Sequence, residues 1–206
     1  MSCLSFVFLR VSSWKEKSLS ETTDQLATDE DLIVKVGQGD IRAFETLVAR
    51  YQKQAIRTAQ RFIGDKQEAE DLAQEAFLTI FRKANQYQSK ASFKTWFFTI
   101  LLNFCRNAAK KKKPSYFNST PVEMAGANDP DSELDRQILQ RALSRAIANL
   151  PANQRSAFIL CHYENFSYVE AAKSLGVSVK AVESLLVRAK RNLREELGWL
   201  RKKTFD

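Results

Sequence analysis

From about position 29 onward, apolar residues recur at three- and four-residue steps along most of the chain, a spacing typical of amphipathic helices. No stretch alternates convincingly with period two, and glycine (6) and proline (4) are scarce. The sequence therefore predicts an all-α protein. The expected helices span residues 29–36, 41–63, 66–83, 93–113, 134–150, 153–163, 168–175 and 179–194.

The helical periodicity stops after residue 113. The stretch 114–135 contains three of the chain's prolines and five acidic residues, but no Lys or Arg. We interpret residues 114–133 as a flexible acidic linker between two small helical domains, 29–113 and 134–206.

Residues 1–28 do not share the helical pattern. Their apolar run 4–11 is too short to span a bilayer. As a signal peptide it would lack a basic segment before it and a small-residue cleavage site after it. We expect residues 1–28 to form a disordered or loosely docked extension.

The stretch 167–194, SYVEAAKSLGVSVKAVESLLVRAKRNLR, predicts two helices around a tight turn. Ser167 and Glu170 have the spacing of a capping box, Gly176 suits a left-handed helix end, and Ser178 is a good N-cap. A helix-turn-helix further needs a small residue and two apolar anchors, and here these are Ala172, Val182 and Leu185. The alternative interpretation is an ordinary helical hairpin.

The second helix of such a unit enters the major groove of DNA. Its apolar stripe leaves Glu183, Ser184, Val187 and Arg188 facing outward. A carboxylate at Glu183 could accept a hydrogen bond from cytosine, or it could pair with Arg188 or Lys180 on the protein surface. The cations suited to phosphate are Lys180, Arg188, Lys190 and Arg191.

The helix predicted from residue 93 is aromatic at its start and basic at its end. It is either a core helix with a solvated end or a surface on which rings stack on bases and cations follow phosphates. The candidate strand-binding residues are Phe93, Trp96, Asn103, Arg106, Asn107, Lys110 and Lys111.

The helix before it carries a polar row of Glu68, Asp71, Gln74 and Glu75. By spacing alone, such a row is typical of a solvated face. Asp71 and Glu75 also have the i, i+4 spacing that could suit a metal-dependent nuclease. No third carboxylate or histidine is evidently placed to complete that site.

Composition narrows the function further. A net charge of +8 and a pI of about 9.4 suit an anionic partner such as nucleic acid. The three cysteines are widely spaced and the single histidine, His162, has no ligand partners beyond Cys161, which predicts a reducing cytoplasm and no metal site. We expect no catalytic residue and no cofactor.

Four motifs occur in order along the chain: EAEDLAQEAFLTIFRK (68–83), FKTWFFTILLNFCRN (93–107), LPANQRSAFIL (150–160) and the helix-turn-helix. Together they closely resemble bacterial RNA polymerase sigma factors of the extracytoplasmic-function group, over about residues 29–197. The alternative, a stand-alone helix-turn-helix regulator, leaves the acidic and aromatic helices unexplained.

The resemblance implies a transcription initiation factor that is not an enzyme. Its partners would be core RNA polymerase, promoter DNA as duplex and melted strand, and an anti-sigma factor as a further candidate, with no lipid substrate. Asp71, Gln74 and Glu75 would dock on the coiled coil of the largest polymerase subunit. The loop 87–92 and the helix from Phe93 would bind the melted minus-ten element, and the C-terminal unit the minus-thirty-five element.

The chain departs from the family pattern at three positions. Members often carry Lys or Arg where this chain has Glu183 and Leu185, and many carry Asp in place of Asn107. We therefore expect a promoter preference that cannot be transferred from relatives.

Overall fold

The computed structural model describes residues 27–111 and 130–198, without the side chains of 130–136. Within those ranges every regular element is helical, which confirms the predicted all-α class. The N-terminal extension up to residue 26 and the linker stretch 112–129 lie outside the described residues.

The N-terminal half consists of α2 (Asp29–Gly37), α3 (Ile41–Ile63), α4 (Lys66–Lys83), the short 3₁₀ turn η1 (Ala84–Gln86) and α5 (Phe93–Lys111). Local chemistry sets the ends of these helices. Asp40 accepts hydrogen bonds from the main-chain N–H groups of Arg42 and Ala43 at 2.9 and 3.2 Å. Gly64 ends α3 in the left-handed region, at φ 80°, and Asp65 caps α4.

Aromatic side chains fill the core between these helices. The Phe77 and Phe97 ring centroids lie 4.8 Å apart. The Tyr51 and Phe93 ring centroids lie 5.3 Å apart, with the two rings in an edge-to-face arrangement. Such contacts add to the burial of apolar surface. They hold α5 against α3 and α4.

The C-terminal half consists of α6 (Pro130–Asn149), α7 (Ala152–His162), α8 (Tyr168–Leu175) and α9 (Val179–Glu196). Helix α6 begins at Pro130, within the stretch interpreted from sequence as linker. Proline is favoured in the first turn of a helix because its missing N–H would have no helical partner there. The sequence analysis missed this helix start because acidic residues and proline are also typical of a linker.

The capping box predicted for α8 is present. The Ser167 hydroxyl accepts from the Glu170 N–H at 3.2 Å, and the Glu170 carboxylate accepts from the Ser167 N–H at 2.8 Å. Gly176 follows at φ 67°, and Ser178 caps α9. The two helices thus form the expected helix-turn-helix.

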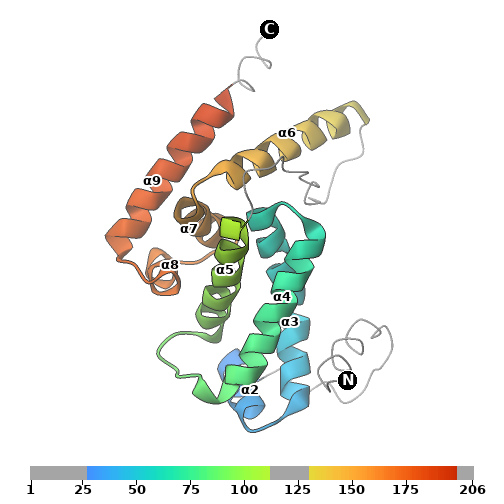
Figure 1. The fold of residues 1–206 in the computed structure, drawn as a ribbon, viewed down its shortest axis with the longest axis vertical. Helices are drawn as coiled ribbons and strands as arrows, with labels where there is room; N and C mark the ends of the chain where they lie inside the picture. The colour runs from blue at the N-terminus through green and yellow to red at the C-terminus, as the bar shows by residue number, and fades with distance from the viewer. Residues whose placement is uncertain (1–26, 112–129, 199–206) are drawn as a thin grey trace.

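The two halves pack against each other. Helix α5 lies between α3 and α4 on one side and α7 and α8 on the other, while α9 lies on the outer side of α7 and α8 (Figure 1). Buried side chains of both halves belong to one continuous cluster. In the described ranges, none of the helices combines the length and the apolar character needed to cross a membrane.

Candidate nucleic-acid and protein interfaces

Helix α9 presents two distinct faces. Val182, Leu186 and Ala189 are buried against the rest of the C-terminal half, and Leu185 is partly buried beside them. The residues predicted to face outward are all exposed: Glu183, Ser184, Val187 and Arg188. Val187 is 69% exposed, which leaves an apolar side chain unpaired on the outer face of the helix.

The charges on α9 are available to a ligand. Among the described residues, Glu183 forms no ion pair, so the predicted alternative of a surface pair with Arg188 or Lys180 is not observed there. Arg191 lies 3.9 Å from Glu195, and both side chains are about 70% exposed. Such exposed pairs contribute little stability. Lys180 and Lys190 are also exposed.

Helix α5 begins with an aromatic cluster at the surface. The Trp96 ring is partly buried and lies 5.3 Å from the Tyr87 ring, whose hydroxyl donates to the Ala91 carbonyl at 2.8 Å. The main-chain N–H of Phe93 donates to the Glu30 carboxylate at 2.8 Å, which fixes the first turn. The sequence analysis assigned the loop 87–92 to the melted strand without singling out Tyr87, although an aromatic residue at the start of a polar loop was the available signal.

Phe93, one of the predicted strand-binding residues, lies in the core. Its ring is fully buried, stacked on Phe97 at 6.0 Å and packed edge-to-face with Tyr51. It also contacts Trp96, with ring centroids 6.4 Å apart. The structure therefore places Phe93 beneath Trp96, and not at the surface where a strand would bind.

The second half of α5 carries a polar face. Asn103, Asn107, Lys110 and Lys111 are exposed. The Arg106 guanidinium donates to Asn103 Oδ1 at 2.5 Å and to Asn153 Oδ1 of α7 at 3.4 Å. Because residues three and four apart share a helix face, this region combines amides and cations on one side of α5.

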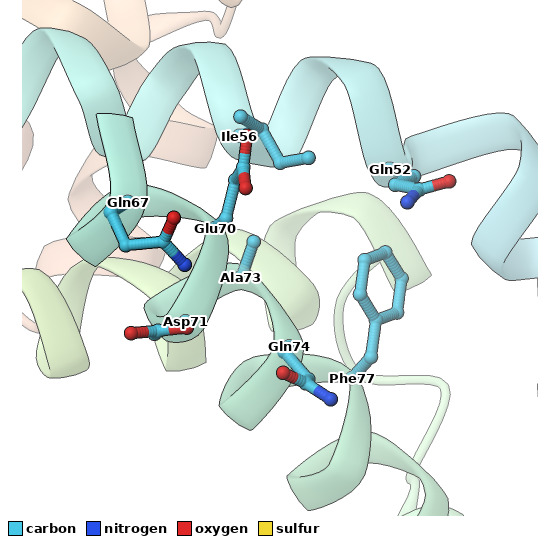
Figure 2. A pocket seen from close by; sticks show the side chains of 8 residues that line it. All are labelled: Gln52, Ile56, Gln67, Glu70, Asp71, Ala73, Gln74 and Phe77. Atoms are coloured by element: carbon cyan, nitrogen blue, oxygen red, sulfur yellow. The ribbon is translucent and has the colours of Figure 1, made fainter. Parts of the chain in front are cut away.

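A hollow of about 350 Å³ lies between α3 and α4 (Figure 2). Asp71 and Gln74 lie at its rim, and the next residue, Glu75, is exposed and 3.8 Å from Arg82. The lining residues are Gln52, Ile56, Gln67, Glu70, Asp71, Ala73, Gln74 and Phe77. Of these lining residues, the sequence analysis named only Asp71 and Gln74 as docking candidates, because the hollow requires a second helix to form.

Burial shifts the pKa values of two groups outside these surfaces, Cys105 and His162. Burial raises the pKa of the Cys105 thiol to about 12, so that this thiol stays protonated at neutral pH. Burial and, to a lesser extent, Lys190 lower the pKa of His162, whose ring lies 4.6 Å from Phe158. Across the described residues, His, Cys, Asp and Glu side chains form no group that could hold a metal ion.

Comparison with family models matches both halves of the chain. Residues 47–114 match the model described as Sigma-70 region 2, and residues 140–193 match Sigma-70, region 4. The first match contains the α3–α4 hollow and α5. The second contains the helix-turn-helix.

Curated relatives match along most of their length. The ECF RNA polymerase sigma-E factor of Escherichia coli is 30% identical over 176 residues, which cover 79% of this chain and 91% of the relative. The RNA polymerase sigma-H factor of Pseudomonas aeruginosa is 29% identical over 180 residues, covering 82% and 93%. The Bacillus subtilis ECF RNA polymerase sigma factor SigW is 27% identical over 178 residues, covering 80% and 94%.

Two solved structures share the fold. CnrH, solved in complex with the cytosolic domain of CnrY, aligns with a TM-score of 0.64 and 26% identity, over 82% of this chain and 97% of that one. RpoE of Bartonella quintana, in complex with the anti-sigma factor NepR, aligns with a TM-score of 0.59 and 25% identity, over 75% and 96%.

Proposed function

Because this chain belongs to the extracytoplasmic-function group of RNA polymerase sigma factors, we propose that each of the three surfaces described above binds a different partner. These partners are core polymerase, the melted promoter strand and the promoter duplex. Sigma factors are transcription initiation factors and not enzymes. They bind core RNA polymerase and promoter DNA. Of the two structural relatives, RpoE was solved with the anti-sigma factor NepR bound and CnrH with the cytosolic domain of CnrY bound. An anti-sigma factor is therefore a partner of the same class here, and the site of action is the cytoplasm, where polymerase and promoter are.

The polymerase-docking surface is the rim of the α3–α4 hollow. Asp71 and Glu75 supply exposed negative charge, and Gln74 supplies an amide beside them. The concave, partly apolar floor provided by Ile56 and Phe77 suits an inserted side chain of the partner. Gln52 and Ile56 of α3 extend the docking surface beyond the residues predicted from the sequence.

The melted strand binds along α5. Tyr87 and Trp96 offer ring faces for base stacking, with Phe93 supporting Trp96 from below. Asn103 and Asn107 offer amides for base edges. Arg106, Lys110 and Lys111 supply cations for the phosphates.

The duplex binds on α9. Glu183, Ser184 and Val187 face the bases, while Lys180, Arg188, Lys190 and Arg191 supply cations for bases or phosphates. An exposed valine suits the methyl group of thymine, which is an apolar feature of the major groove.

One observation carries this proposal: the two sigma-70 regions occur in order on one chain, with Asp71 and Glu75 exposed on α4 and the predicted base-facing residues exposed on α9. A stand-alone helix-turn-helix regulator would require only the second region. Its DNA binding would not depend on polymerase.

Reversing the charge at Asp71 tests the docking surface. The Asp71→Lys variant should lose co-purification with core polymerase, because a cation would face the surface that accepts the carboxylate. Its thermal unfolding, followed by circular dichroism, should stay near that of the wild type, since Asp71 is exposed. Glu195→Lys makes the same charge reversal at an exposed residue of α9. It serves as the control and should co-purify normally with core polymerase.

Normal co-purification of Asp71→Lys would remove Asp71 from the docking surface. A large loss of thermal stability in Asp71→Lys would instead show that Asp71 stabilises α4.

A further inference from the structure

The first turn of α2 joins this helix to both α3 and α5 through two adjacent carboxylates. Asp29 accepts hydrogen bonds from the Tyr51 hydroxyl at 2.5 Å and from the Arg50 guanidinium at 2.7 Å, both on α3. Glu30 accepts from the main-chain N–H of Phe93, the first residue of α5, at 2.8 Å. The start of α2 therefore connects α3 to the end of α5 where the aromatic cluster lies.

The Phe93 N–H depends on an acceptor from elsewhere in the chain. The first N–H groups of an α-helix have no acceptor within the helix itself. Ser92 serves the next ones: its hydroxyl accepts from the Thr95 N–H at 3.2 Å, and its carbonyl accepts from the Trp96 N–H at 3.1 Å. For Phe93 the acceptor is Glu30, 63 positions earlier. A hydrogen bond to a carboxylate is stronger than one between neutral groups, so it fixes the first turn of α5 on α2.

Ring contacts carry the position of this first turn to the rings offered for base stacking. The buried Phe93 ring lies 6.4 Å from the Trp96 ring, and Trp96 lies 5.3 Å from Tyr87. On its other side, Phe93 packs edge-to-face with Tyr51. Burial and, to a lesser extent, the charge of Glu30 raise the pKa of Tyr87, so this carboxylate also acts on the second ring of the pair.

Glu30 is not what attaches α2 to the rest of the fold. Leu32 and Ile33 are fully buried and Val36 is 4% exposed, so apolar burial holds the helix in place. Glu30 itself is only partly buried. Because a protein hydrogen bond replaces one to water, its net contribution to stability is small. What the Glu30 contact adds is the direction and position of the first turn of α5.

We infer that Glu30 is a positioning residue for the melted strand: its carboxylate fixes the first turn of α5 and thereby the Trp96 and Tyr87 rings on which bases stack. This inference rests on the proposed function for its consequence in transcription, but not for the contact itself. Stacking requires a ring face at a defined place and angle, so a displaced first turn weakens it. Helix α9 lies outside this chain of contacts, so recognition of the minus-thirty-five element should not depend on Glu30.

Amide hydrogen exchange of the full-length chain tests the contact without transcription. Glu30→Leu removes the acceptor but keeps a side chain of similar size, and exchange in residues 87–96 should become on the order of tenfold faster. Glu30→Gln keeps an oxygen that can accept the same bond and should exchange like the wild type. Glu45→Leu removes another partly exposed carboxylate, on α3, and serves as the control. Unchanged exchange in Glu30→Leu would overturn the inference.

Selection of run-off transcripts from randomised templates tests the consequence for promoter recognition. With core polymerase, Glu30→Leu should weaken the preference for at least one base of the minus-ten element about tenfold, because a stacked base loses its ring. Its preference at the minus-thirty-five element should stay that of the wild type. Glu30→Gln and Glu45→Leu should keep both preferences.

Two results of this selection would overturn the positioning role. One is a uniform fall in transcript with unchanged base preference in Glu30→Leu, which would show a merely structural residue. The other is the same loss of preference in Glu30→Gln as in Glu30→Leu, because the amide oxygen keeps the hydrogen bond. Transcripts absent even with the wild-type chain would instead contradict the proposed function, and hydrogen exchange alone would then decide on the contact.

Discussion

Glu183 is an acidic side chain on the outer face of α9, a helix that also exposes Lys180, Arg188, Lys190 and Arg191. A carboxylate repels phosphates, so it weakens general attraction to DNA. The structure leaves Glu183 exposed and without an ion pair among the described residues, beside exposed Val187. An unpaired carboxylate in the major groove has one favourable base partner, the amino group of cytosine.

Replacing Glu183 with Gln should therefore change preference at one base pair of the minus-thirty-five element, by about 1–3 kcal/mol. The change is measured by transcription from a panel of promoter mutants with wild-type and variant holoenzyme. Glu195→Gln, which removes an exposed charge near the other end of α9, should keep the wild-type order of preference. If Glu183→Gln keeps the wild-type order of promoter preference, Glu183 does not contact a base directly and affects DNA binding only through its charge.

Sequence-based prediction worked at positions where the chemistry is local. The caps formed by Ser167 and Ser178 depend only on a side chain and the next three residues, and the structure confirms them. Phe93 shows where this approach fails. Aromatic residues occur on several faces of α5, so spacing alone could not tell the ring in the core from the ring at the surface.

Helix α5 combines a packed aromatic first half with a polar, cationic second half. Lys110 and Lys111 are exposed near its end, beyond the exposed amides of Asn103 and Asn107. Cations that contact phosphates release counterions, which makes binding depend on salt. We therefore expect the binding of the melted strand to α5 to weaken as the salt concentration rises.

The double variant Lys110→Gln/Lys111→Gln should flatten the salt dependence of open-complex formation. Each lost contact to a single-stranded phosphate should reduce the slope of log K against log salt by about 0.7. The control is Lys53→Gln/Lys83→Gln, which removes the same charge from exposed positions on α3 and α4. An unchanged slope for the α5 variant would show that these lysines do not contact the strand.

The elements themselves were largely predictable, because each amphipathic helix buries its own stripe. Features made by two elements were not. The α3–α4 hollow needs Gln52 and Ile56 opposite Asp71, and no periodicity links residues on different helices. The start of α6 at Pro130 was also missed, because proline and acidic residues suit both a linker and a first helical turn.

For the whole molecule, the sequence predicted the all-α class, and four ordered motifs indicated the sigma-factor family. It did not predict that the two halves would pack together. Glu164 and Thr58 are 106 positions apart, and each looks like an ordinary surface residue in its local pattern. The boundaries of the two domains stay predictions, since the halves share one buried cluster.

Dependence of promoter recognition on core polymerase tests the sigma-factor function most directly. Purified core polymerase is mixed with a pool of templates randomised upstream of the start site, with the full-length chain added or omitted, and the run-off transcripts are sequenced. Transcripts should appear only when both proteins are present, and the selected templates should share two sequence elements about 25 base pairs apart, on the order of 85 Å along the duplex. The same transcripts from core alone, or full sequence preference of the chain for DNA without core, would contradict the function.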